Sequence, residues 1–304
     1  MTEKEKYKMA IQLMSKEKES RKKSAVIFDE LVEKANDNTI RMQSILYLVV
    51  LLNAVDHNSR IIAVCDKGLT LGKKLNDYGS VAYLMSIKAK CLEEQASLCN
   101  YEKHSLSSSL GWFNYSLESD REKADIFDKK GAMLEEQSKI LIDDAIKMAE
   151  KIQRHDALAN ILMMSGEIYG GMYLTGKIRK MKKPKLYLFL NKFHLDDFYM
   201  RFIEGDGETW RCIKKSEALL LRASQIFESL GNQTNQAYAF YNLANQLRLA
   251  REFRKAKKYL EKARSIAQIK NDIPLLESIV ILEETIRAKN KDVPDYINGE
   301  RRAD

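Results

Sequence analysis

Residues 237–272 read AYAFYNLANQLRLAREFRKAKKYLEKARSIAQIKND. The first half places apolar side chains at the i, i+3, i+4, i+7 spacing of one helix face, namely Phe240, Leu243, Ala244 and Leu247. The second half carries a similar stripe, with small alanines where two helix backbones would approach most closely: Phe253, Ala256, Leu260 and Ala263. Two facing stripes predict an antiparallel helical hairpin that turns near Arg251 and Glu252.

A single hairpin cannot bury both of its faces, so related units are expected elsewhere in the chain. Residues 223–232 (ASQIFESLGN) align with residues 263–272 (ARSIAQIKND), 40 positions apart since 263 − 223 = 40. Residues 68–77 (GLTLGKKLND) match the same segment, and residues 145–156 (AIKMAEKIQRHD) form a fourth copy if two additional residues are allowed. The pattern therefore predicts an array of hairpins with a period close to 40 residues.

The order of large and small residues in this hairpin resembles the tetratricopeptide repeat. Phe240 and Leu247 stand where that family usually has tryptophan and tyrosine, and Gln268 stands at the position of its proline. In a second unit, four residues stand at the positions where the family has a large residue, leucine, glycine and tyrosine: Leu162, Ser165, Gly166 and Tyr169. The resemblance implies an all-α, right-handed superhelical solenoid of antiparallel helix hairpins, whose first helices line a concave groove for an extended or helical peptide.

The composition agrees with an all-α protein. Three prolines and thirteen glycines in 304 residues leave few helix breakers. The longest apolar run, residues 45–52, is too short to cross a bilayer, and the first residues lack the apolar core of a signal peptide, so a cytoplasmic protein without membrane association is predicted. The four cysteines do not have the paired spacing of metal ligands. We therefore predict reduced thiols, no metal site and no cofactor.

We expect one solenoid over residues 1–289 and a polar tail over residues 290–304. The predicted helices cover residues 7–14, 24–35, 40–55, 59–75, 80–99, 121–154, 157–173, 211–230 and 275–288, besides the two of the opening hairpin. Asp272, Ile273 and Pro274 suit the start of the closing helix. A serine-rich, aromatic segment at residues 104–119 interrupts the pattern; its Trp112, Phe113 and Tyr115 have two interpretations, a ligand platform or a plug at the end of the core.

The largest departure from a regular array is an insert over residues 176–210, within the fourth hairpin. Long excursions from a compact scaffold are often functional. The insert begins with KIRKMKKPK, which holds six basic and no acidic residues, and continues with the aromatic stretch LYLFLNKFHLDDFYMRFI. This stretch is compatible with a β-hairpin or with a short helical lid.

Positive charge is concentrated in two places, although the whole chain carries +8. The first is the insert, with Lys177, Arg179, Lys180, Lys182, Lys183 and Lys185. The second is a stripe at helical spacing on the last hairpin, formed by Arg251, Lys255, Lys258 and Lys262. Cations beside aromatic rings suit nucleic acid, where charge meets phosphates and rings stack on bases. The alternative interpretation of both basic groups is a solvated surface. The stripe on the last hairpin could also bind an acidic partner other than nucleic acid.

Catalytic sequence patterns are absent: there is no glycine-rich phosphate loop with Lys-Ser/Thr, no GxSxG and no HExxH. We therefore expect a binding protein rather than an enzyme. Carried onto this chain, the family's groove positions fall on Tyr238, Tyr241, Asn242, Asn245 and Arg248. The segment YNLAN resembles that of peptide-pheromone receptors built from such repeats, in which an asparagine amide holds the peptide backbone.

Two functional hypotheses follow from these features. The first is a protein- or peptide-binding adaptor or scaffold, which includes the regulatory subunit of an enzyme. The second is a nucleic-acid-associated protein that uses the basic, aromatic residues 177–203 and the basic residues 248–264. For the two asparagines there is also a structural interpretation, in which Asn242 and Asn245 only bond to neighbouring helices.

Overall fold

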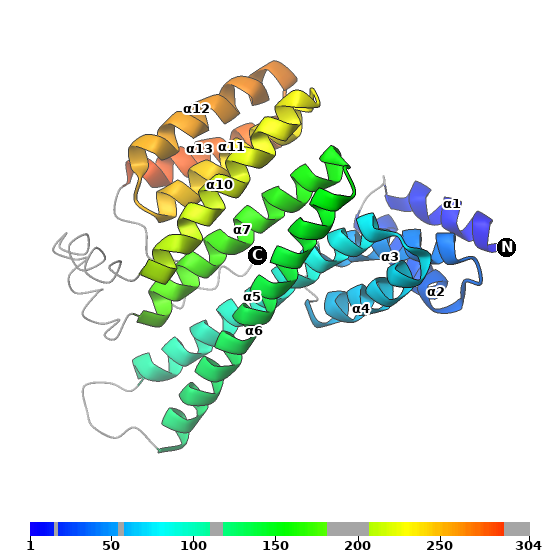
Figure 1. The fold of residues 1–304 in the computed structure, drawn as a ribbon, viewed down its shortest axis with the longest axis horizontal. Coiled ribbons are helices and arrows are strands. Elements are labelled where there is room, and N and C mark those ends of the chain that lie inside the picture. Colours follow the sequence, from blue (N-terminus) through cyan, green and yellow to red (C-terminus); the bar gives the residue numbers. More distant parts are fainter. Residues whose placement is uncertain (15–17, 54–57, 110–117, 181–206, 289–304) are drawn as a thin grey trace. The chain divides into compact units, whose positions relative to one another are not determined.

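The computed structural model describes residues 1–14, 18–53, 58–109, 118–180 and 207–288. Throughout these residues all the regular structure is helical (Figure 1). The helices are α1 (Glu3–Met14), α2 (Lys18–Lys34), α3 (Asn38–Asn53), α4 (Asn58–Leu75), α5 (Tyr78–Ser109), α6 (Glu118–Lys151), α7 (His155–Lys180), α10 (Gly207–Ser229), α11 (Gln233–Leu249), α12 (Phe253–Lys270) and α13 (Ile273–Arg287). The predicted all-α class is confirmed.

The chain divides into two compact units. The first comprises residues 1–92 and 138–157, and the second residues 93–137 and 158–304. In the first unit α1 to α4 pack consecutively, and rings from three of these helices meet in the core. The Phe28 ring on α2 lies with its centroid 6.0 Å from Tyr7 on α1 and 5.4 Å from Tyr47 on α3.

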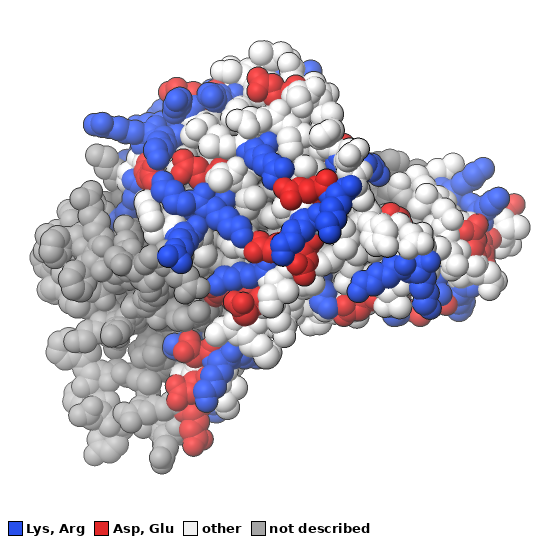
Figure 2. All heavy atoms as spheres, viewed as in Figure 1, with Lys and Arg blue, Asp and Glu red and all other residues white. Residues whose placement is uncertain are grey.

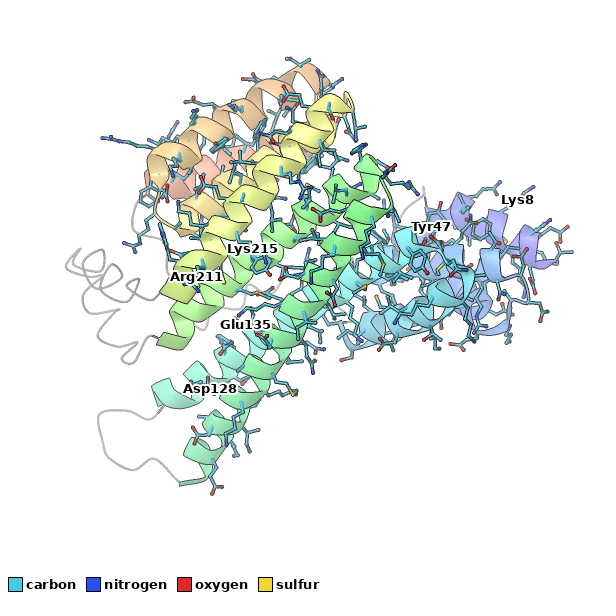
Figure 3. The ribbon with its side chains drawn as sticks, in the orientation of Figure 1. Lys8, Tyr47, Asp128, Glu135, Arg211 and Lys215 are labelled. Carbon is cyan, nitrogen blue, oxygen red and sulfur yellow. The ribbon has the colours of Figure 1, made fainter. Side chains whose placement is uncertain are left out.

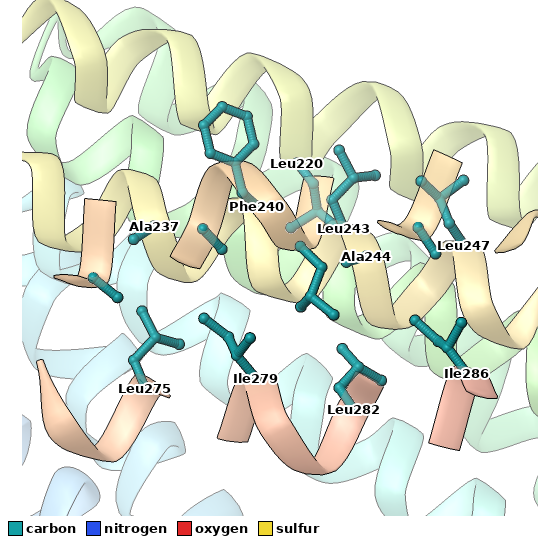
Figure 4. Close-up of a cluster of buried hydrophobic side chains, with 14 residues drawn as sticks. Leu220, Ala237, Phe240, Leu243, Ala244, Leu247, Leu275, Ile279, Leu282 and Ile286 are labelled. Atoms are coloured by element: carbon teal, nitrogen blue, oxygen red, sulfur yellow. The ribbon is translucent and has the colours of Figure 1, made fainter. Parts of the chain in front are cut away.

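In the second unit α10, α11, α12 and α13 pack consecutively, and α11 also contacts α13. The apolar stripes that define the predicted hairpin form the centre of this core (Figure 4). Leu243 of α11 and Ala256 and Ala263 of α12 are fully buried, as the sequence pattern predicts. The closing helix adds Leu275, Ile279, Leu282 and Ile286 to the same cluster.

Two helices approach their neighbours closely at glycines. In α4, a β carbon at Gly68 would lie 2.5 Å from Leu84 Cδ1, and one at Gly72 would lie 2.6 Å from Val81 Cγ2. Such distances leave no room for a larger residue, because overpacking a core displaces its neighbours. In α7, Gly166 lies against Leu220 of α10 in the same way, at 2.5 Å from Leu220 Cγ.

The aligned sequence segments end in the same kind of turn. Asn76, Gly231 and Asn271 all have positive φ, at 56°, 67° and 52°. Glycine and asparagine tolerate this left-handed conformation best, which is why they are common directly after a helix. At the third turn the next residue, Asp272, accepts a hydrogen bond from the Leu275 amide at 3.2 Å and caps α13.

The structure differs from the sequence-based prediction at one helix end and in the basic stripe. The segment starting at residue 104 does not break the helix at once, because α5 continues to Ser109. Arg251 does not belong to the last basic helix: it lies in the turn with φ of 61°, and α12 starts at Phe253. The aromatic residues 112–115, the aromatic part of the insert from 187 to 203 and the tail 290–304 lie outside the described residues.

Candidate functional site

The five predicted groove residues form one half-buried stripe along α11. We call Tyr238, Tyr241, Asn242, Asn245 and Arg248 the α11 polar face. They share this face because they recur every three or four residues, while the buried stripe occupies the opposite side of the helix. All five residues are half-buried, and Tyr238 and Tyr241 pack against the buried cluster of the second unit.

Charged neighbours fix the orientation of both asparagine amides. Asn242 Nδ2 donates to Glu167 Oε1 on α7 at 2.5 Å, so its amide nitrogen faces the carboxylate. Asn245 Oδ1 accepts from Arg248 Nε and from a terminal guanidinium nitrogen, both at 3.2 Å. Since a carboxylate only accepts and a guanidinium only donates, the alternative amide orientations would lose these bonds.

The fixed orientations leave complementary groups on adjacent turns. Neither asparagine side chain makes a further hydrogen bond with the described part of the chain. Asn242 therefore presents its Oδ1 acceptor, and Asn245 presents its Nδ2 donor. A peptide unit needs one donor and one acceptor of this kind.

The two tyrosines of the face remain protonated phenols at neutral pH. Burial raises the pKa of Tyr238, and the negative charge of Asp272 and a hydrogen bond with that carboxylate raise it further. Burial also raises the pKa of Tyr241, although the positive charge of Arg248 opposes the shift. Each phenol therefore supplies a hydroxyl and a ring surface, but no negative charge, to the face.

Behind the α11 polar face lies a contact that sequence reasoning did not identify. Gln246 is 7% exposed, and its Oε1 atom has no hydrogen-bond partner in the described part of the chain. This amide lies directly against Gly170 of α7: a β carbon there would lie only 1.9 Å from Oε1. The glycine thus permits α7 to approach α11 closely enough for Glu167 to reach Asn242.

A second polar contact joins α7 to α10. Lys215 on α10 is labelled in Figure 3; its Nζ donates to the Tyr169 hydroxyl at 2.7 Å and lies 4.2 Å from the centre of that ring. In the sequence, Tyr169 stands only at the tyrosine position of the tetratricopeptide pattern. Its hydroxyl could not have been matched with Lys215, because the two residues are 46 positions apart.

The structure describes only some of the basic residues that were predicted to contact nucleic acid or an acidic partner. Lys177, Arg179 and Lys180 belong to the last turns of α7, where the side chains are not described, and Lys182, Lys183 and Lys185 lie outside the described residues. On α12, Lys258 and Lys262 are exposed as expected. Lys255 is exposed too, but it pairs with Glu252 at 2.5 Å.

The described residues contain no group of histidine, cysteine and acidic side chains that could hold a metal ion. Cys65, Cys91, Cys99 and Cys212 are buried free thiols. Burial, and secondarily the neighbouring Cys91, raises the pKa of Cys65 to about 12. A thiol with this pKa is protonated at neutral pH and is a poor nucleophile.

Among the helices that the structure describes, none combines the length and apolarity needed to cross a membrane. Neither a protein-family model nor a curated protein matches the chain. The resemblance to tetratricopeptide repeats stays a prediction from the sequence.

Proposed function

We propose that the protein binds a peptide segment of a partner protein on the α11 polar face and acts as an adaptor or regulatory subunit. The proposal includes the finer arrangement expected from the sequence, a solenoid of hairpins whose first helices line the binding surface. The observation that carries it is the fixed pair of amides, with the Asn242 acceptor and the Asn245 donor one turn apart.

This chemistry favours recognition of a peptide backbone. Amide groups match a peptide unit without regard to its side chain, since each amide offers a donor and an acceptor. Fixing them in advance lowers the entropy lost on binding. The tyrosine rings provide large contact surfaces with few rotatable bonds, which is why tyrosine is common in binding surfaces.

Selection from a random displayed-peptide library tests the proposal. We expect selected peptides to bind the full chain and to lose about tenfold or more in affinity for Asn242→Ala/Asn245→Ala, because each lost hydrogen bond contributes about 0.5–1.5 kcal/mol. Gln225→Ala removes an exposed amide from α10 and is the matched control. Failure to enrich any peptide, or equal affinity of the double variant, would refute the proposal.

A further inference from the structure

The outer side of α12 is unusually rich in uncompensated positive charge. From Arg254 to Lys262, every exposed residue of the helix is charged, and Glu261 is the sole acidic residue among them. In Figure 2, Lys and Arg side chains gather at the upper left, where Figure 1 places α12.

Ion pairing separates the cations of this helix into two groups. Lys255 is compensated by Glu252 at 2.5 Å and by Glu217 of α10 at 3.8 Å, and Arg264 by Glu283 of α13 at 2.6 Å. Four exposed cations have no such partner in the described part of the chain: Arg254, Lys257, Lys258 and Lys262. We call these four residues the α12 basic patch.

The α12 basic patch is a short row of charges with one of its members held in place. Its first and last residues are eight positions apart, which corresponds to about 12 Å along the helix axis. Lys262 Nζ lies 5.2 Å from the Phe240 ring centre and 5.5 Å from that of Tyr259. These two rings stack with centroids 5.9 Å apart, so the lysine is positioned by cation–π contacts rather than by a carboxylate.

The composition of the patch distinguishes between classes of macromolecular partner. Protein interfaces bury apolar and aromatic side chains at their centres and are depleted in lysine. Between Arg254 and Lys262 no apolar residue of α12 is exposed, and three of the four patch residues are lysines. Isolated cations without an apolar centre instead suit phosphodiester groups, whose binding is driven by counterion release.

We propose that the α12 basic patch binds the phosphodiester backbone of nucleic acid without reading its sequence. Four cations that each neutralise one phosphate give a slope of log K against log salt of about −3 for a single strand and about −3.6 for a duplex. A slope of −3 corresponds to a loss of affinity of roughly 50-fold or more between 50 and 200 mM salt. This activity is separate from peptide binding on the α11 polar face.

Fluorescence anisotropy of the full chain with a labelled 30-nucleotide single strand and with a 30-base-pair duplex tests the proposal. The substitutions Arg254→Gln, Lys257→Gln, Lys258→Gln and Lys262→Gln are combined in one variant. We expect the salt slope to become less negative by about 3 units for the single strand or about 3.6 for the duplex, whatever other basic residues contribute. The strand type that shows this change identifies the bound form.

A matched control removes the same charge from exposed lysines elsewhere: Lys73, Lys74, Lys129 and Lys151, each changed to Gln. We expect this control to keep the wild-type slope, and circular dichroism to show that both variants are folded. No binding of wild type at 20 mM salt, or equal slopes for the patch variant and the control, would overturn the proposal. Tighter binding to poly-glutamate or to vesicles containing phosphatidylserine than to either oligonucleotide would overturn it too.

Discussion

Gly170→Ala offers a direct test of how α7 and α11 are held together behind the α11 polar face. The new β carbon would lie 1.9 Å from Gln246 Oε1 and 2.1 Å from Gln246 Cδ, so the whole amide must move. Because Gln246 is 7% exposed, the amide has little free space to enter. The substitution therefore forces either an unfavourable side-chain rotamer or a separation of the two helices.

The expected change in the free energy of unfolding of Gly170→Ala is the sum of opposing effects. Overpacking a buried site costs about 1–3 kcal/mol, and an off-rotamer side chain about 0.5–1.5 kcal/mol. Alanine gains about 1 kcal/mol over glycine within a helix. We expect Gly170→Ala to lower the free energy of unfolding by about 2 kcal/mol, which corresponds to a fall in melting temperature of several degrees.

Urea unfolding followed by circular dichroism measures this change, and Gln246→Ala provides the second arm of a double-mutant cycle. In the Gly170→Ala background we expect Gln246→Ala to restore most of the lost stability, since it removes the colliding amide. Gly79→Ala is the control: its nearest contacts would be at 3.6 and 3.8 Å, an ordinary separation. Unchanged stability of Gly170→Ala, or no recovery in the double variant, would show that the described contact between Gly170 and Gln246 is wrong.

Two other predictions concern titrating groups. Burial opposes ionisation of Glu252, but its hydrogen bond with Lys255 and the charge of Lys214 lower its pKa overall. Because the pKa of Glu252 is lower in the folded state, its charge stabilises the fold above the unfolded pKa of about 4.3, and this stabilisation is lost as the pH falls through the folded pKa. Glu252→Gln should therefore lower the free energy of unfolding by about 0.5–1 kcal/mol at pH 7. Near pH 2 it should have no effect on that free energy, and urea titrations at the two pH values measure the difference. The buried Cys65 thiol, with a pKa of about 12, should not react with a thiol-specific disulfide reagent at pH 8 until denaturant is added. Rapid labelling of Cys65 in the native protein would contradict its burial.

The helices were predictable because their signals are local. Pro274 and the capping residue Asp272 mark the start of α13 in the sequence, and the structure has both in these roles. Asn271 ends α12 in the left-handed conformation, which is a local feature of the same kind although we did not predict it from the sequence. Such signals depend on a few neighbouring residues, so periodicity and capping preferences identify them without knowledge of the fold.

The neighbours of the candidate site were not predictable in the same way. Glu167 bonds Asn242 from 75 positions away, and no pattern in either helix indicates that pairing. Arg251 fits the spacing of the basic stripe, yet its positive φ places it in the turn. Long-range pairing depends on how the helices approach one another, which the contacts at Gly166 and Gly170 determine through distances that a sequence pattern does not contain.

The two faces that we propose to bind different partners are compatible with what holds the hairpin together. The α11–α12 contact depends on small and aliphatic residues such as Ala244, Ala256 and Leu260, and the two helices are joined by a short turn in which Arg251 has positive φ. None of these constrains the outward positions of either helix. Amides on α11 and uncompensated cations on α12 are therefore compatible with one scaffold, and the substitutions proposed at Asn242, Asn245 and the α12 basic patch replace no residue of the buried cluster. For this reason the peptide and nucleic-acid experiments are separable: loss of one activity with the other retained identifies the face responsible.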